Sequence, residues 1–189
     1  MRKNHAPLTV APGKSAVKVA LWVFAAMFFL FCRRAVAGEA SEGSTPLLLT
    51  SPAFQAHTII PKKYSCQGED INPPLVIEGI PKATKTLALI MDDPDAPMGT
   101  WVHWVVYNIA VTPKIEENSI PGEEADNSFN RKRYGGPCPP SGTHRYFFKI
   151  YALDSFLQLH PPADKKVLEK AMEGHILDRA ELVGLYNKE

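Results

Sequence analysis

An acidic, proline-containing turn directly after a strongly apolar stretch most constrains the fold of this chain. Thr86–Met91 ("TLALIM") is a nearly continuous apolar run, typical of a strand buried on both faces. The residues that follow, Asp92–Pro97 ("DDPDAP"), contain two prolines, and proline fixes φ and removes a backbone donor. The strand therefore has to end there, with its carboxylates at the point where the chain leaves the sheet.

Further segments predict more strands. Trp101–Ala110 and His144–Asp154 are rich in β-branched and aromatic residues, and residues 57–61 and 74–81 are weaker candidates. Many of the 17 prolines flank these segments, as expected for a loop-rich β fold.

The pattern changes after Pro162. Residues 163–174 predict a helix with Asp164 as its N-cap and Gly174 as its stop, and residues 175–188 predict a second helix. The sequence therefore predicts a mainly β fold, a β-sandwich with C-terminal helices, and its length of 189 residues suits one domain.

The N-terminal part has the pattern of a secretory signal peptide. A basic start precedes the apolar run Val19–Cys32, which is shorter than the roughly 20 residues a helix needs to cross a bilayer. Ala35-Val36-Ala37 then offers a small-residue cleavage site. We expect residues 1–37 to be a cleaved signal, 38–46 a flexible tether and 47–189 the domain, in a periplasmic or secreted protein. The alternative is a membrane anchor formed by uncleaved residues 19–32.

Cleavage changes the charge and therefore the expected partners. It removes six of the 21 basic residues and none of the 20 acidic ones, which leaves a net charge of −5. Such a chain is a poor ligand for nucleic acid or for an anionic membrane surface, because both need clustered Lys and Arg. Contact with a membrane is expected only through an uncleaved N-terminal segment.

Two cysteines, Cys66 and Cys138, remain after cleavage. In an exported chain they are candidates for a disulfide, which would contribute roughly 4 kcal/mol in the chain-entropy model. Two buried free thiols are the alternative.

Two stretches carry candidate site residues. In the first, Asp93 ends one strand and His103 lies early in the next, where strict alternation would put it on one face with Val105, Tyr107 and Ile109. The alternative is that the aspartate only caps the turn and the histidine packs in the core.

The second stretch is Tyr134–Phe148, "YGGPCPPSGTHRYFF". His144 and Tyr146 should share one face of a strand while Arg145 points away, and Pro139–Pro140 is a candidate cis bond. A His and a Tyr beside glycine amides are good donors to a small anion. An ordinary β-turn before an aromatic strand is the alternative.

These two stretches resemble the signature motifs of the phosphatidylethanolamine-binding protein family, in its bacterial Raf-kinase-inhibitor-like branch. The D-P-D-A-P, W-x-H and G-x-H-R-Y elements occur in the family's order, and the resemblance extends over Leu47–Lys188. It implies a β-sandwich with a shallow pocket for phosphate, acetate or a phospholipid head group. The matching ligand-binding residues are Asp93 and Pro97 in one wall, Trp101 and His103 in the second, Gly136, Pro139 and Pro140 in the rim, and His144 and Tyr146. Tyr186 is a looser match, to a tyrosine of a C-terminal helix near the mouth.

The residues favour a binding protein without a cofactor over an enzyme. Anion binding should weaken as the pH rises above the histidine pKa values. A hydrolase using Asp93, His103 and His144 is a rival, but Ser141 lacks the surroundings of a nucleophile. A metal site on the same three residues lacks a recognised ligand spacing. A regulator or inhibitor of an unidentified protein partner, such as a kinase or protease, is the remaining alternative.

Overall fold

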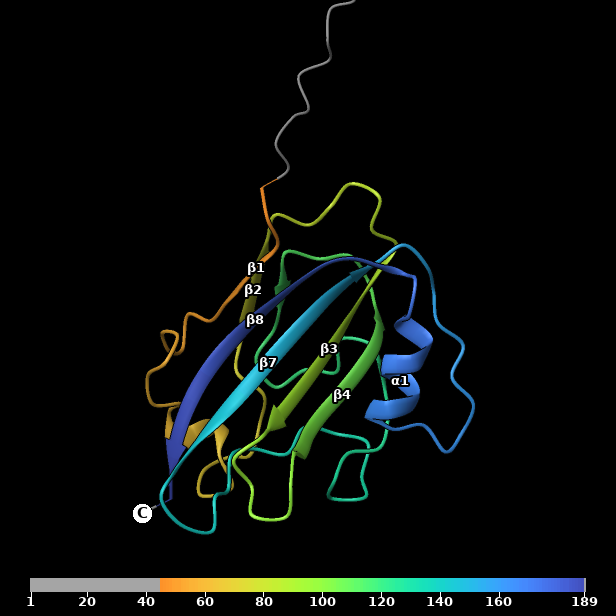
Figure 1. Cartoon of the computed structure of the whole chain (residues 1–189). Helices are drawn as coiled ribbons and strands as arrows, with labels where there is room; N and C mark the ends of the chain where they lie inside the picture. The colour runs from red at the N-terminus through yellow and green to blue at the C-terminus, as the bar shows by residue number, and fades with distance from the viewer. Residues whose placement is uncertain (1–44, 189) are drawn as a thin grey trace, which may run out of the picture. The chain divides into compact units, whose positions relative to one another are not determined.

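The computed structural model describes residues 45–188, so the predicted signal peptide and most of the predicted tether lie outside the described residues. The fold is mainly β, as predicted, with two antiparallel sheets (Figure 1). The larger sheet has five strands in the order β6-β4-β3-β7-β8, and the smaller has three in the order β1-β2-β5. Their bounds are β1 Leu48–Thr50, β2 Leu75–Glu78, β3 Thr86–Asp93, β4 Trp101–Ile109, β5 Lys114–Ile115, β6 Glu123–Glu124, β7 Thr143–Leu153 and β8 Ile176–Asn187.

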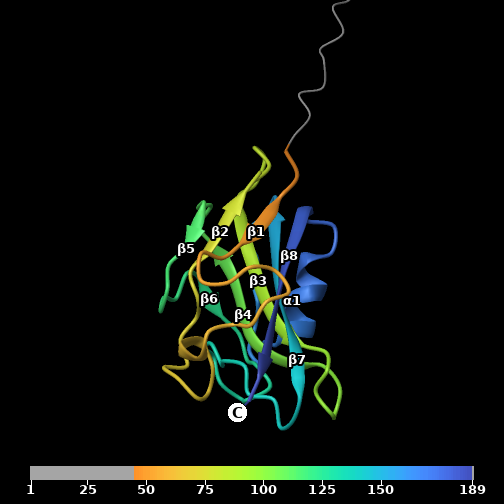
Figure 2. The same ribbon diagram turned by 90° about the vertical axis from the view of Figure 1, so that its left-hand side faces the viewer.

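The elements form three layers. Figure 2 shows the small sheet and the helix α1 (Lys165–Met172) on opposite sides of the large sheet. The main core lies between the two sheets, where Leu49 and Ile77 of the small sheet join Leu89 and Phe148 of the large one. A second apolar cluster fills the space under α1.

Strand β3 at the centre of the large sheet confirms the expectation of a strand buried on both faces. All eight of its residues are buried. Leu87, Leu89 and Met91 belong to the main core, while Ala88 and Ile90 belong to the cluster under α1. The strand includes Asp92 and Asp93. Both carboxylates are therefore buried and held by a strand, not by a loop.

Helix α1 is the predicted first helix. The Asp164 side chain accepts a hydrogen bond from the Val167 amide, and Leu168 and Met172 are buried. The Asp92 carboxylate, on the helix side of β3, forms ion pairs with Lys149 of β7 and Lys165 of the helix. This buried carboxylate therefore fastens the helix to the sheet. Within residues 45–188, no helix has the length and apolar character to cross a membrane.

Three local expectations were wrong. Residues 175–188 form strand β8 in place of a second helix, because they pair along almost the whole length of β7. Residues 57–61 contribute only an isolated bridge between Ile59 and Leu185. The cis peptide bond of the described chain joins Pro161 to Pro162 and not Pro139 to Pro140.

Candidate functional site

Loops from three parts of the chain meet at one end of the large sheet. They are the β3–β4 turn, the segment 126–135 and the segment before β7 (Figure 1). Between them lies a cavity of about 420 Å³. Its lining residues are Asp93, Ala96, Pro97, Met98, Trp101, His103, Phe129, Cys138 and Pro140. A larger cavity of about 900 Å³ lies beside α1, but three of its five charged lining residues, Asp164, Lys166 and Glu169, are exposed.

A β-bulge aims His103 at this cavity. Met91 pairs with Trp104 and Asp92 pairs with Val102, so His103 is an extra residue in β4. Its ring packs edge-on against Tyr146, with the ring centroids 5.2 Å apart. The predicted alternation was therefore wrong, since Val105 and Tyr107 face the cluster under α1 instead.

A second register shift lies between Leu87 and Leu89 of β3, and Ile109 of β4 packs in the main core. Ile109 therefore does not share a face of β4 with Val105 and Tyr107, contrary to the predicted alternation.

His103 is held in one tautomer. It is 2% exposed, and its Nδ1 lies 2.7 Å from the carbonyl oxygen of Gly135. A carbonyl can only accept, so Nδ1 carries the hydrogen and Nε2 is left as an acceptor. Burial lowers the pKa of His103, which favours the neutral ring despite the nearby Asp93 carboxylate. His103 therefore presents an uncharged acceptor at neutral pH.

Asp93 forms a buried pair with His144. The distance from His144 Nδ1 to Asp93 Oδ2 is 2.7 Å, and the Asp95 amide donates to Asp93 Oδ1 at 2.8 Å. Asp93 is 3% and His144 7% exposed. This arrangement fixes the histidine ring, as an orienting carboxylate does.

Arg145 points away from this pair, as predicted. Its guanidinium binds both oxygens of Asp95, at 2.9 and 2.7 Å, and its amide donates to the same carboxylate. The hydrogen bonds from Arg145 hold the pKa of Asp95 at about 2. The acidic turn is thereby fastened to the first residues of β7.

The Tyr146 hydroxyl is the unusual polar group of the site. Tyr146 is fully buried, and its oxygen has no hydrogen-bond partner of acceptable geometry. The hydroxyl lies near the Asp93 carboxylate and the backbone of Cys138, and burial, followed by the charge of Asp93, raises the pKa of Tyr146. It is therefore a neutral donor beside His103, which lines the cavity, although Tyr146 itself does not line it.

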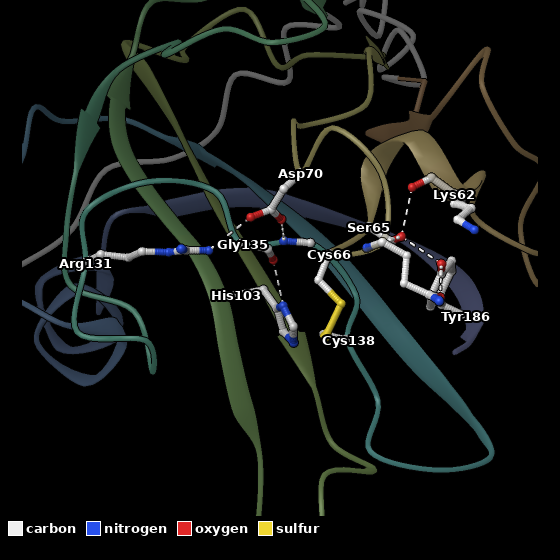
Figure 3. The surroundings of a disulfide bond; sticks show 11 residues. Lys62, Ser65, Cys66, Asp70, His103, Arg131, Gly135, Cys138 and Tyr186 are labelled. Atoms are coloured by element: carbon white, nitrogen blue, oxygen red, sulfur yellow. Dashed lines mark hydrogen bonds and ion pairs between the residues drawn. A yellow bond between two sulfur atoms is a disulfide. The ribbon is translucent and has the colours of Figure 1, made fainter. Parts of the chain in front are cut away.

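The rim of the cavity, which we define as residues 134–142, is fastened to the loop 62–70. Cys66 and Cys138 form a disulfide with their Cα atoms 5.5 Å apart, which excludes the free-thiol alternative (Figure 3). The Gly136 amide donates to Asp70 at 2.6 Å, and a Cβ on this glycine would lie 2.4 Å from a backbone oxygen. Gly136 therefore permits close packing of the rim and does not line the cavity.

Tyr186 does not lie at the mouth of the cavity on a helix. It belongs to β8 and is 4% exposed, and its hydroxyl lies 2.7 Å from the Ser65 hydroxyl (Figure 3). The same hydroxyl donates to Gln67 Oε1 at 2.8 Å. Its role is to fix the loop 62–70 behind the disulfide.

Comparison with known proteins identifies the family. The sequence model described as phosphatidylethanolamine-binding protein matches residues 50–187. The chain belongs to the phosphatidylethanolamine-binding protein family. A UPF0098 protein of Pyrococcus horikoshii is 49% identical over 75% of this chain and 77% of its own length. Another, from Methanothermobacter thermautotrophicus, is 47% identical over 74% of this chain and 98% of its own length.

Solved structures agree with this fold. The crystal structure of a phosphatidylethanolamine-binding protein homologue from Chlamydia trachomatis is 43% identical, with a TM-score of 0.74, and covers 77% of this chain and 100% of its own. YbcL of E. coli, described as a member of the mammalian family, has a TM-score of 0.71 at 24% identity and shows the fold alone, over 77% of this chain and 100% of its own.

The structure brings most of the family-matched residues to one place. Asp93, Pro97, Trp101, His103 and Pro140 line the cavity. His144 and Tyr146 lie behind the cavity lining, where His144 is paired with Asp93 and Tyr146 packs against His103. Gly136 and Pro139 lie in the rim but do not line the cavity.

Sequence reasoning did not predict Ala96, Met98 and Phe129 as site residues, and it placed Cys138 in the rim and in a possible disulfide without predicting contact with the ligand. Phe129 packs edge-on against both Trp101 and His103. It comes from a segment without strand or motif pattern, so no local signal marked it. Within residues 45–188, no group of three or more His, Cys, Asp or Glu side chains is arranged to hold a metal ion.

Proposed function

We propose that this cavity binds a small phosphorylated anion of the phospholipid head-group type. The observation that carries the proposal is the buried Tyr146 hydroxyl, which makes no well-aligned hydrogen bond although the Asp93 carboxylate and the Cys138 backbone in the cavity wall lie close to it. A buried hydroxyl without a hydrogen bond is unfavourable by about 1–3 kcal/mol, so such a group indicates a missing ligand or water.

The polar groups at the inner end of the cavity, Asp93 and His103 in its lining and Tyr146 behind them, favour an anion that still carries a proton. His103 Nε2 and the Asp93 carboxylate accept hydrogen bonds, whereas the Tyr146 hydroxyl donates. A monoprotonated phosphate ester supplies one O–H donor and several acceptors. A fully ionised phosphate supplies acceptors only. Because the second pKa of a phosphate ester is about 6, binding should weaken as the pH rises through that value.

The wall of the cavity suits a head group attached to an apolar tail. Pro97, Met98, Trp101, Phe129 and Pro140 surround the polar floor with apolar atoms. Such a combination orients an amphiphilic ligand with its polar end inward. The family's description as phosphatidylethanolamine-binding supports a ligand of this class.

A binding role is proposed in preference to catalysis. The Asp93–His144 pair resembles the base half of a hydrolase site, but within residues 45–188 no Ser or Thr hydroxyl is hydrogen-bonded to a histidine. Ser141 of the rim is exposed and makes no such contact. We also propose, from the N-terminal pattern, that the protein acts in the periplasm or outside the cell.

A regulatory role toward another protein is the second candidate. Met98, at the tip of the β3–β4 turn, is 96% exposed, and Trp101 beside it is 37% exposed. Exposed apolar side chains around a pocket are typical of surfaces that contact a partner.

The test is an NMR titration of the purified protein with phosphoethanolamine and, separately, inorganic phosphate between pH 5 and 8. We expect saturable shifts that weaken with rising pH and that are lost in His144→Gln. The control is His175→Gln. His175 also pairs with an aspartate, Asp154, with Nδ1 and Oδ1 2.9 Å apart, but this pair is partly exposed and does not line the cavity. Absence of shifts in the wild type, or an affinity that is flat across this pH range, would contradict the proposal.

A further inference from the structure

We propose that the Cys66–Cys138 disulfide positions the rim of the cavity, so that a dithiol reductant weakens ligand binding without unfolding the domain. This inference rests on the proposed function and names a regulation of the same site. It is drawn from the way the rim is attached to the rest of the protein.

The first half of the rim is held by several hydrogen bonds. The Tyr134 hydroxyl donates to the Tyr64 carbonyl, and Gly135 exchanges hydrogen bonds with His103. The Gly136 amide donates to Asp70, and the Cys66 amide donates to the Pro137 carbonyl at 3.1 Å. These contacts persist when the disulfide is opened, so residues 134–137 keep their place.

The second half depends on the disulfide. In the part of the chain that the structure describes, residues 139–142 make no hydrogen bond or ion pair, and the next paired residue is Thr143 of β7. Apart from the packing of the buried Pro139 and the nearness of the Tyr146 hydroxyl to the Cys138 backbone, the Cys66–Cys138 bond is the cross-link that positions residues 138–142 (Figure 3). Because Cys138 and Pro140 line the cavity, the position of this half decides the shape of one wall.

The disulfide is also accessible to a reductant. Cys66 is exposed and Cys138 is partly exposed. A thiolate of the dithiol attacks one sulfur, the S–S bond breaks, and the second thiol of the reductant then resolves the mixed disulfide. Two electrons pass to Cys66 and Cys138, which end as two thiols carrying the protons of the dithiol, and the reductant leaves as a cyclic disulfide.

The consequence for binding follows from preorganisation. With the rim fixed, its wall is in place before the ligand arrives. With the bond open, residues 138–142 have to be ordered when the ligand binds, and that ordering subtracts from the affinity. We expect the dissociation constant to rise about tenfold, which corresponds to about 1.4 kcal/mol.

The test compares oxidised and dithiothreitol-reduced protein in the phosphoethanolamine titration, with circular dichroism of each form. The expected result is about tenfold weaker binding by the reduced form, with an unchanged fold. The double variant Cys66→Ser/Cys138→Ser should bind as weakly as the reduced protein and be insensitive to dithiol. If this variant does not fold, the two forms of the wild type still provide the comparison.

Equal affinity of the two forms would overturn the inference, and so would global unfolding on reduction, because the bond would then hold the whole domain. If the oxidised protein binds nothing, the proposed function fails separately. The inference is then decided by ¹⁵N relaxation at Ser141 and Gly142. Increased mobility of these residues on reduction supports it, and unchanged mobility overturns it.

Discussion

Replacing Tyr146 by Phe should stabilise the ligand-free protein and weaken ligand binding. The substitution removes one oxygen and keeps the ring, which is fully buried and packs edge-on against His103. The hydroxyl makes no well-aligned hydrogen bond, so the folded state of the variant no longer bears the desolvation of a poorly paired polar group. We expect the free energy of unfolding to rise by about 1 kcal/mol, within the ~1–3 kcal/mol by which such a group is unfavourable. For a domain of this size, that raises the melting temperature by about 2–4 °C.

The matched control is Tyr134→Phe. Tyr134 is also buried, but its hydroxyl donates to the Tyr64 carbonyl at 2.8 Å. Removal of this donor leaves a buried carbonyl unpaired, which should lower the free energy of unfolding by about 1–2 kcal/mol. The same chemical change should therefore act with opposite signs at the two positions.

The assay is urea denaturation of the oxidised protein without ligand, followed by the phosphoethanolamine titration of each variant. If Tyr146→Phe is destabilised as much as Tyr134→Phe, the hydroxyl has a partner in the ligand-free protein and the reasoning is refuted. If it is stabilised but binds phosphoethanolamine as well as the wild type, the hydroxyl does not contact the ligand.

Three further predictions test the burial of His103, the ion pairs of Asp92 and the close packing of Gly136. Burial lowers the pKa of His103, so the unfolded state binds a proton more readily than the folded state. The free energy of unfolding should therefore fall as the pH drops below about 6.5. In urea denaturation at pH 5 and 7, His103→Gln should show a smaller difference between the two pH values than the wild type. Asp92→Asn should lower the free energy of unfolding by about 3 kcal/mol, because it leaves the charges of Lys149 and Lys165 without their buried partner; a loss below about 1 kcal/mol would show that water screens this cluster. Gly136→Ala should displace the rim, because the new methyl group would lie 2.4 Å from a backbone oxygen, and the titration should show weaker binding with an intact fold by circular dichroism.

Local patterns in the sequence predicted those features that depend on local chemistry. The apolar run of β3 and the prolines after it predict a buried central strand that ends in an acidic turn. The same kind of reasoning found the N-cap of α1 at Asp164 and the common face of His144 and Tyr146. In each case, the period of the element or the geometry of one residue decides the outcome.

Strand pairing and the meeting of distant segments depend on contacts made in the folded chain. The segment Ile176–Asn187 has an apolar pattern that fits a helix locally, and its pairing with β7 makes it a strand. His103 faces the cavity because a bulge in the register with β3 turns it there, and a bulge is a property of two strands together. Phe129 joins the site from a segment without periodicity, and the bond between Cys66 and Cys138 depends on two loops 72 residues apart in the sequence. These contacts arise between distant parts of the chain, so no local pattern of residues determines them.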